Sequence, residues 1–285
     1  MRRFAPLGVV LAIAGAPGPG QQTPTFTSGV EVVRVDVLVT SGGVPVGGLT
    51  RNDFELLDNA VPQRIDVLAS DQTPVNVVLA FDASGSLTAE RREHLRSAAT
   101  GLLDGLRPSD KAGLITFSHV VARRSALTGN VGQVRAALEG LSGGGDTALA
   151  DGCYAALMLG QSETGRALVI VFSDGVDTAS WLPTERVLDA ASRADVVAYA
   201  VTVNPGASPA FLRDLARATG GRLYENRSTA DLRETFLRVL DEFRHRYVLT
   251  YTPSGVQKGG WHGLTVRVKG RRVDIQARPG YLGGS

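Results

Sequence analysis

The apolar residues of the chain follow two patterns, which divide it into three segments. In residues 30–70 and 246–282, short runs alternate between apolar and polar positions, separated by turns that contain Gly or Pro. Such alternation is typical of strands with one buried face. In residues 73–244, short unbroken apolar runs are instead followed by helical patterns. Runs without alternation predict strands buried on both faces, so the middle segment has the pattern of an α/β domain.

The middle segment predicts a doubly wound, mainly parallel sheet with helices on both of its faces. Buried strands are expected at residues 76–81, 112–117, 167–172 and 196–203, and an edge strand at 120–127. Helices are expected near residues 88–106, 131–141, 148–159, 184–194, 211–219 and 230–244. Because parallel strands need crossover connections, this alternation of strands and helices defines the fold class.

The two flanking segments predict a small β-sandwich-like unit built from both ends of the chain. Residues 30–39 place valines on one face and Arg34, Asp36 and Leu38 on the other, which predicts a half-buried strand. Neither segment is large enough to bury a core by itself, so we expect 30–70 to pair with 246–282. The α/β domain, residues 72–245, should then fold alone. Further strands are expected at 54–57, 63–69, 247–251, 263–268 and 273–277.

The first residues have the pattern of an export signal. Two arginines precede the apolar run Leu7–Ala14, and the small residues around Ala16 form a cleavage site. We therefore expect a signal peptide over residues 1–16, cleaved after Ala16, and a linker over 17–29. The apolar run is too short for a membrane anchor, and no later segment is long and apolar enough to cross a bilayer. These features predict a secreted or periplasmic protein without stable membrane insertion.

Composition limits the classes of partner. The 285 residues are 43% hydrophobic and 20% charged, so the chain can bury a large core and is not disordered by composition. The net charge is +2, and the arginines occur as isolated pairs instead of a basic stripe, which argues against nucleic-acid binding. Cys153 is the single cysteine, so no internal disulfide can form, and its apolar, helical surroundings predict a buried structural residue.

The turn after the first buried strand of the α/β domain combines an acid with two hydroxyls. Asp82, Ser84 and Ser86 alternate with small residues, so three oxygen donors can converge on one point. Such oxygens suit a hard cation such as Mg²⁺. In the alternative interpretation, Asp82 and Ser84 only turn the chain, and Ser86 or Thr88 caps the following helix.

A second buried strand ends in the same way. Asp174 follows the strand 167–172, and in an open α/β sheet the carboxyl ends of neighbouring strands meet at the ligand crevice. The glycines 143–145 allow a loop to approach the same place, and Thr147 follows them with a further hydroxyl. Together these residues are a nearly complete set for an octahedral Mg²⁺ that keeps some waters. The predicted metal site is Asp82, Ser84, Ser86, Thr147 and Asp174.

These residues resemble the metal-ion-dependent adhesion site of the von Willebrand factor type A domain. That family carries Asp-x-Ser-x-Ser, a distant Thr and a distant Asp, and residues 82–86, Thr147 and Asp174 match them in order and context over residues 73–244. The resemblance implies that the three hydroxyl side chains touch the metal, while the two aspartates act through waters. The flanking residues 45–54 and 277–281 are similar to those of bacterial exported proteins that carry this domain between β segments.

The chemistry of such a site favours binding over catalysis. Three neutral hydroxyls leave a divalent cation under-neutralised, so it attracts a carboxylate from an Asp or Glu of a partner. We therefore expect an adhesion or scaffold module, and not an enzyme, that captures a protein partner through Mg²⁺, or through Mn²⁺ or Ca²⁺. The nearby Asp146, Asp151 and Asp177 are expected to be turn or helix-start residues, with Asp146 the best suited of the three to tune the charge of the metal.

The sequence offers little support for catalysis. Ser84 is not part of a Gly-x-Ser-x-Gly elbow, the four histidines provide no placed base, and no phosphate-binding loop is present. His119, at a strand end near the same sheet edge, is expected to be structural or solvent-facing. A metal-dependent hydrolase acting at the same site is the alternative function, because a cation with open positions can activate water. A metal that only stabilises the fold is the third interpretation.

Overall fold

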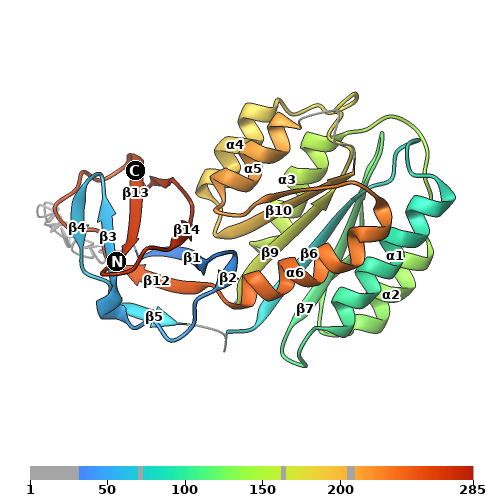
Figure 1. Ribbon diagram of the computed structural model, residues 1–285. Coiled ribbons are helices and arrows are strands. Elements are labelled where there is room, and N and C mark those ends of the chain that lie inside the picture. Colours follow the sequence, from blue (N-terminus) through green and yellow to red (C-terminus); the bar gives the residue numbers. More distant parts are fainter. Residues whose placement is uncertain (1–31, 70–72, 162–164, 204–208, 285) are drawn as a thin grey trace, which may run out of the picture. The chain divides into compact units, whose positions relative to one another are not determined.

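A computed structural model describes residues 32–69, 73–161, 165–203 and 209–284 (Figure 1). The predicted signal peptide, residues 1–16, and the predicted linker, residues 17–29, lie outside the described residues. Within those residues, no helix is both long enough and apolar enough to span a bilayer.

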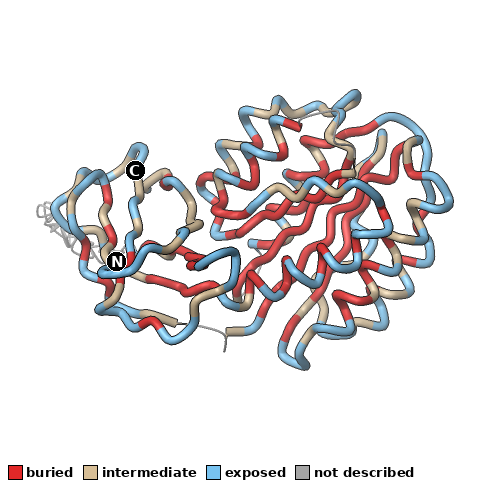
Figure 2. Tube along the Cα trace, in the orientation of Figure 1, coloured by how far each residue is buried: buried red, intermediate tan, exposed pale blue. Residues whose placement is uncertain are grey.

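The central sheet of the α/β domain has six strands in the part of the chain that the structure describes (Figure 1). Strands β6 (Val75–Asp82) and β9 (Arg166–Phe172) are buried along their whole length, which explains why their sequences are apolar without alternation (Figure 2). Neighbouring strands run parallel, except that β8 returns antiparallel to β7 as an edge hairpin. The spatial order is β11 (Leu223–Asn226), β10 (Val196–Val203), β9 (Arg166–Phe172), β6 (Val75–Asp82), β7 (Lys111–Phe117) and β8 (Val121–Thr128).

Helices cover both faces of this sheet, so the predicted doubly wound α/β fold is confirmed. Each face has its own cluster of buried apolar side chains, because residues of one strand point alternately to the two faces. One face carries α1 (Ala89–Asp104), α2 (Val131–Glu139) and α6 (Leu232–Arg244). The other face carries α3 (Leu149–Gly160), α4 (Thr184–Arg193) and α5 (Ala210–Ala218).

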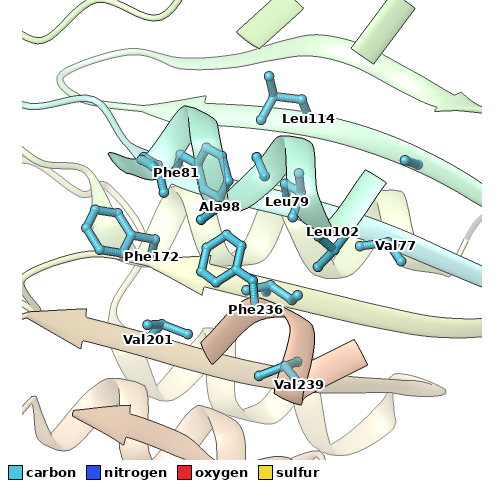
Figure 3. Close-up of a cluster of buried hydrophobic side chains, with 14 of the residues drawn as sticks. Val77, Leu79, Phe81, Ala98, Leu102, Leu114, Phe172, Val201, Phe236 and Val239 are labelled. Atoms are coloured by element: carbon cyan, nitrogen blue, oxygen red, sulfur yellow. The ribbon is translucent and has the colours of Figure 1, made fainter. Parts of the chain in front are cut away.

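The core on the first face extends to the carboxyl edge of the sheet. Phe81 and Phe172, the penultimate residue of β6 and the last residue of β9, pack with Phe236 of α6 (Figure 3). The rings of Phe81 and Phe236 lie 6.0 Å apart between centroids. These aromatic side chains hold the ends of the two strands beneath the polar turns that follow them.

The flanking segments combine into antiparallel sheets, as predicted for a sandwich-like unit. Strands β1 (Val33–Ser41) and β3 (Phe54–Asp58) from the first segment pair with β12 (Tyr247–Tyr251) and β13 (Gly260–Val268) from the last segment, around a third apolar cluster. One sheet has the order β14 (Asp274–Gln276), β1 (Val33–Ser41), β12 (Tyr247–Tyr251) and β5 (Val67–Ala69), with β2 (Val44–Pro45) beside β1. The other has the order β15 (Gly280–Gly283), β13 (Gly260–Val268), β3 (Phe54–Asp58) and β4 (Val61–Gln63). Short 3₁₀ helices occur at Arg51–Asp53 and Thr229–Asp231.

Two predictions for these segments are wrong. Strand β1 is buried on both faces and not on one, because Asp36 on its second face pairs with Arg166 of β9 at 2.6 Å. The single strand expected at residues 63–69 is interrupted, since β4 pairs with β3 in one sheet and β5 pairs with β12 in the other. The intervening residues carry the chain from one sheet to the other.

Candidate metal centre

The Asp82 turn begins where β6 ends, at the carboxyl edge of the sheet. Asp82 Oδ1 accepts a hydrogen bond from the Ser84 amide at 2.9 Å. The hydroxyl oxygens of Ser84 and Ser86 lie 3.2 Å apart. Asp82 and Ser84 are buried, whereas Ser86 is half-buried. The turn therefore gathers a carboxylate and two hydroxyls, with Ser86 nearest to solvent.

The helix that follows the turn is capped by Thr88. The Thr88 hydroxyl accepts a hydrogen bond from the Arg91 amide at 3.3 Å. The Ser86 hydroxyl lies instead beside that of Ser84. Thr88, and not Ser86, is therefore the N-cap of α1. The Ser86 hydroxyl does not cap the helix, so it remains available as a metal ligand.

Ser173 is not among the predicted site residues, but it makes the closest contact to Asp82. Phe81 and Phe172 are opposite each other in the parallel pair β6–β9, so the residues that follow them meet. The fully buried Ser173 donates its hydroxyl to Asp82 Oδ2 at 2.7 Å. The sequence feature that indicates this contact is a hydroxyl residue directly after a buried strand. It identifies Asp82 as the partner only when the strand order is known.

The glycine-rich loop, residues 143–145, approaches the Asp82 turn through its backbone. The Gly144 amide donates to the Ala83 carbonyl, and the Gly85 amide donates to the Gly145 carbonyl, both at 3.0 Å. A Cβ atom on Gly143 would lie 2.6 Å from the carbonyl oxygen of Leu87, a distance that side chains do not tolerate. The missing side chain at Gly143 is therefore what allows the close approach.

Thr147 is positioned by the loop that follows β9. Its amide donates to the Thr178 hydroxyl at 2.9 Å, and its carbonyl accepts from the amides of Thr178 and Ala179. Thr147 is buried. These contacts tie its backbone to the loop after β9, whereas no hydrogen bond joins its side chain to the serine hydroxyls among the described residues.

Asp174 and Asp82 face the same small hollow. Burial raises the pKa of Asp82, and the neighbouring charge of Asp174 raises it further, while the hydrogen bonds from Ser84 and Ser173 act in the opposite direction. The hollow has a volume of about 10 Å³, which is room for one water-sized sphere. It is lined by Asp82, Ser86, Leu87, Arg91, Phe172, Asp174, Val203 and Thr229.

The oxygen donors around this strand end suit a hard divalent cation, although only Asp82, Ser86 and Asp174 of the predicted set line the hollow, and Ser84 and Thr147 do not. Neighbouring ligands of an octahedral Mg²⁺ at about 2.1 Å lie roughly 3 Å apart, close to the spacing of the Ser84 and Ser86 hydroxyls. The described residues contain no cluster of three or more His, Cys, Asp or Glu side chains suited to a metal. A metal held by the predicted residues would therefore depend on hydroxyls and waters as well as on the carboxylates of Asp82 and Asp174.

The other acids near the site support the backbone. Asp177 Oδ2 accepts from the Ala150 amide at 3.0 Å, and Asp151 accepts from two amides of the loop after β9. Both are the helix-start and turn residues expected from the sequence. Asp146 is exposed. His119 packs against Gly145, since a Cβ atom there would lie 2.3 Å from its Nδ1 atom.

The fold and the motif together define the class of this protein. The sequence model of the von Willebrand factor type A domain matches residues 76–238, more than half of the chain, so the chain belongs to that family. Domains of the family mediate protein–protein interaction and typically bind a divalent metal at this motif. The predicted family membership is confirmed.

A curated relative is similar over most of this chain. It is the inter-alpha-trypsin inhibitor heavy chain H4 of Homo sapiens, which is 23% identical over 278 residues, 90% of this chain and 29% of that protein. The chain thus spans less than a third of the length of the curated relatives it matches.

Two solved structures share the fold. The von Willebrand factor type A protein from Catenulispora acidiphila has a TM-score of 0.54 at 15% identity, covering 81% of this chain and 72% of that chain. Proximal thread matrix protein 1 from the mussel byssus, with a zinc-occupied MIDAS motif (the metal-ion-dependent adhesion site), has a TM-score of 0.55 at 17% identity, covering 66% of this chain and 50% of that chain.

Proposed function

We propose that this chain is a protein-binding module that captures a carboxylate of its partner through a divalent cation. The observation that carries the proposal is that Asp82, Ser86 and Asp174, from two adjacent strand ends, line one water-sized hollow. In this proposal the hydroxyls of Ser84, Ser86 and Thr147 hold the cation directly. Asp82 and Asp174 orient its waters and balance part of its charge.

The donor set supports binding over catalysis. When bound, the cation supplies an electrophilic position that attracts an anionic oxygen, because the hydroxyl ligands are neutral. Asp82 already accepts hydrogen bonds on both of its carboxylate oxygens, from the Ser84 amide and the Ser173 hydroxyl, so it is poorly placed to serve as a general base. An Asp or Glu side chain of a protein partner is the ligand that completes such a site.

The cation is proposed to be Mg²⁺, with Mn²⁺ or Ca²⁺ as substitutes. All residues of the set offer hard oxygen ligands, which suit these ions better than soft metals. The zinc-occupied MIDAS motif of the mussel protein supports a divalent cation at this position of the fold and does not define the metal here.

The wider organisation is also part of the proposal. We place the adhesion module at residues 73–244, between β segments 30–70 and 246–282 that pair with each other. A signal peptide over residues 1–16 and a linker over 17–29 make the protein secreted or periplasmic, the compartment in which an adhesion or scaffold module meets its partners.

Cation binding is tested with Mn²⁺ as the probe, by electron paramagnetic resonance titration of the full chain. We expect Ser86→Ala to weaken Mn²⁺ binding by roughly tenfold or more, since it removes a ligand oxygen that has no capping role. Ser97→Ala is the matched control, because Ser97 is an exposed serine of α1, and it should leave the Mn²⁺ affinity unchanged. Equal Mn²⁺ binding by the wild type and Ser86→Ala would exclude this site.

Partner capture is tested with peptides that differ in a single carboxylate. The full chain should retain a Glu-containing peptide on a column in Mg²⁺, release it in EDTA, and fail to retain the Gln version of the same peptide. Retention that persists in EDTA contradicts the proposal. Turnover of phosphoester or peptide substrates that is lost in Ser84→Ala would favour the metal-dependent hydrolase instead.

A further inference from the structure

A second hollow lies at the opposite end of the parallel strands from the cation site. It is found where α4 ends and β10 begins, beside the first residues of β1 and the C-terminal β segment, and its volume is about 190 Å³. None of the residues that line it belongs to the cation site. It is large enough for several water molecules or for a small ligand.

The lining of this hollow is strongly positive. Three arginines, Arg34, Arg193 and Arg278, face a single acid, Asp195, which leaves two positive charges in excess. Arg34 neutralises the charge of Asp195, because its Nη1 atom lies 3.2 Å from Asp195 Oδ2. Its Nε atom lies 3.4 Å from Asp36 Oδ2. The excess charge is therefore carried by Arg193 and Arg278.

Arg278 is held in the wall of the hollow by neutral groups. Its Nε atom donates to the Gly280 carbonyl at 3.0 Å, and its Nη2 atom donates to the Ser192 carbonyl. Burial lowers the pKa of Arg278, while the charge of Asp195 acts in the opposite direction. These carbonyl contacts fix the guanidinium in place but leave its charge without a carboxylate within ion-pair distance among the described residues.

Arg193 lies in the last turn of α4 and is exposed. A basic residue at this position interacts favourably with the helix dipole, which is a small structural effect. No ion pair or side-chain hydrogen bond occupies its guanidinium within the described ranges, so the group is available to a ligand in the hollow.

We propose that this hollow binds a compact dianionic oxyanion, of the kind presented by a phosphate monoester. A phosphate monoester carries a charge close to −2 at neutral pH, which matches the two excess positive charges. Guanidinium groups donate paired hydrogen bonds to phosphate and carboxylate oxygens. The hollow exceeds the volume of the oxyanion alone, and Val32 and Leu282 give it apolar walls for an organic substituent. This site is independent of the cation-dependent function proposed above.

The probe for this site is inorganic phosphate, titrated into the full chain by calorimetry at constant ionic strength. EDTA is present and divalent metals are absent, so that phosphate cannot act as a ligand of a metal at the cation site. Succinate serves as a second arm, because it carries a charge at least as large as that of phosphate but on separated carboxylates. We expect saturable phosphate binding by the wild type, with succinate at least tenfold weaker.

The variants separate a built site from general electrostatic attraction. Arg193→Gln removes an exposed side chain and should weaken phosphate binding at least tenfold without loss of folding. Arg186→Gln removes the same charge from an exposed position on the same helix, outside the hollow, and should leave the affinity unchanged. Arg278→Lys keeps the charge but loses the paired donors, so it should also weaken binding. The absence of saturable binding by the wild type, or an equal loss in Arg186→Gln and Arg193→Gln, would overturn the proposal.

Discussion

Arg91 places a positive charge beside the predicted cation site. It lines the same hollow as Asp82 and Asp174, and its Nη1 atom donates to the Ser86 carbonyl at 3.2 Å. Within the described residues, no carboxylate forms an ion pair with it. A free guanidinium next to a bound cation is unfavourable unless an anion lies between the two charges. A partner carboxylate that contacts both the cation and Arg91 satisfies this condition.

Replacing Arg91 should therefore change cation binding and carboxylate binding in opposite directions. In Arg91→Ala we expect Mn²⁺ to bind about threefold more tightly without peptide, because a repulsion of about 0.5–1 kcal/mol is removed. The Glu-containing peptide should bind more weakly in the presence of Mg²⁺. Arg92→Ala, one residue away and outside the hollow, should change neither quantity. Parallel loss of both affinities in Arg91→Ala would show that Arg91 has only a structural role.

At the scale of elements, the loop 143–147 forms hydrogen bonds with the segments that follow both strand ends of the site. Gly143→Ala should destabilise the protein by about 1–3 kcal/mol and weaken Mn²⁺ binding, because the added Cβ meets the backbone of Leu87 and displaces the loop. Gly144→Ala is the matched control, since a Cβ there has no neighbour within 4 Å. Urea unfolding and Mn²⁺ titration of both variants measure the effect, and similar behaviour of the two would contradict the role of close approach at Gly143.

The elements themselves were largely predictable, whereas their contacts were not. Unbroken apolar runs predicted β6 and β9 because burial on both faces removes the need for alternation. Alternation is a poor guide to burial in β1. Its sequence alternates, but its second face is also buried, because Asp36 on that face is paired with Arg166. The role of Ser173 could not be predicted from the sequence for a related reason. Its partner Asp82 lies in another strand, and only the strand order brings the two together.

At the scale of the whole described chain, buried arginines link the flanking β sheets to the α/β domain. Arg166 of β9 donates from Nε and Nη2 to Asp36 Oδ1 at 3.0 and 2.6 Å, and Arg246 donates to the carbonyls of Asp36 and Gly220. Both arginines are fully buried. The expectation that residues 72–245 fold alone stays a prediction. Such a fragment would lack β1, so the buried Arg166 would lose the Asp36 carboxylate with which it pairs.

The pH dependence of stability should report this ion pair. Burial alone would raise the pKa of Asp36, but Arg166, with Arg34 and Arg246, lowers it below its usual value. Because the pKa is lower in the folded state, the pair stabilises the protein above the unfolded pKa of about 4, and this contribution is lost as the pH falls through the folded value. Because of this ion pair, the free energy of unfolding should decrease as the pH falls below about 4.

Asp36→Asn tests this contribution directly. At pH 7 it should reduce the free energy of unfolding by about 3–5 kcal/mol, because it leaves the buried Arg166 without an opposite charge. Below pH 4 the carboxylate is protonated in the unfolded state but still charged in the folded state, so the wild type progressively loses this contribution and the difference between the two proteins should shrink. Urea unfolding at a series of pH values measures both effects. A difference that stays constant from pH 7 to pH 3 would mean that Asp36 stabilises this junction by packing and not by its charge.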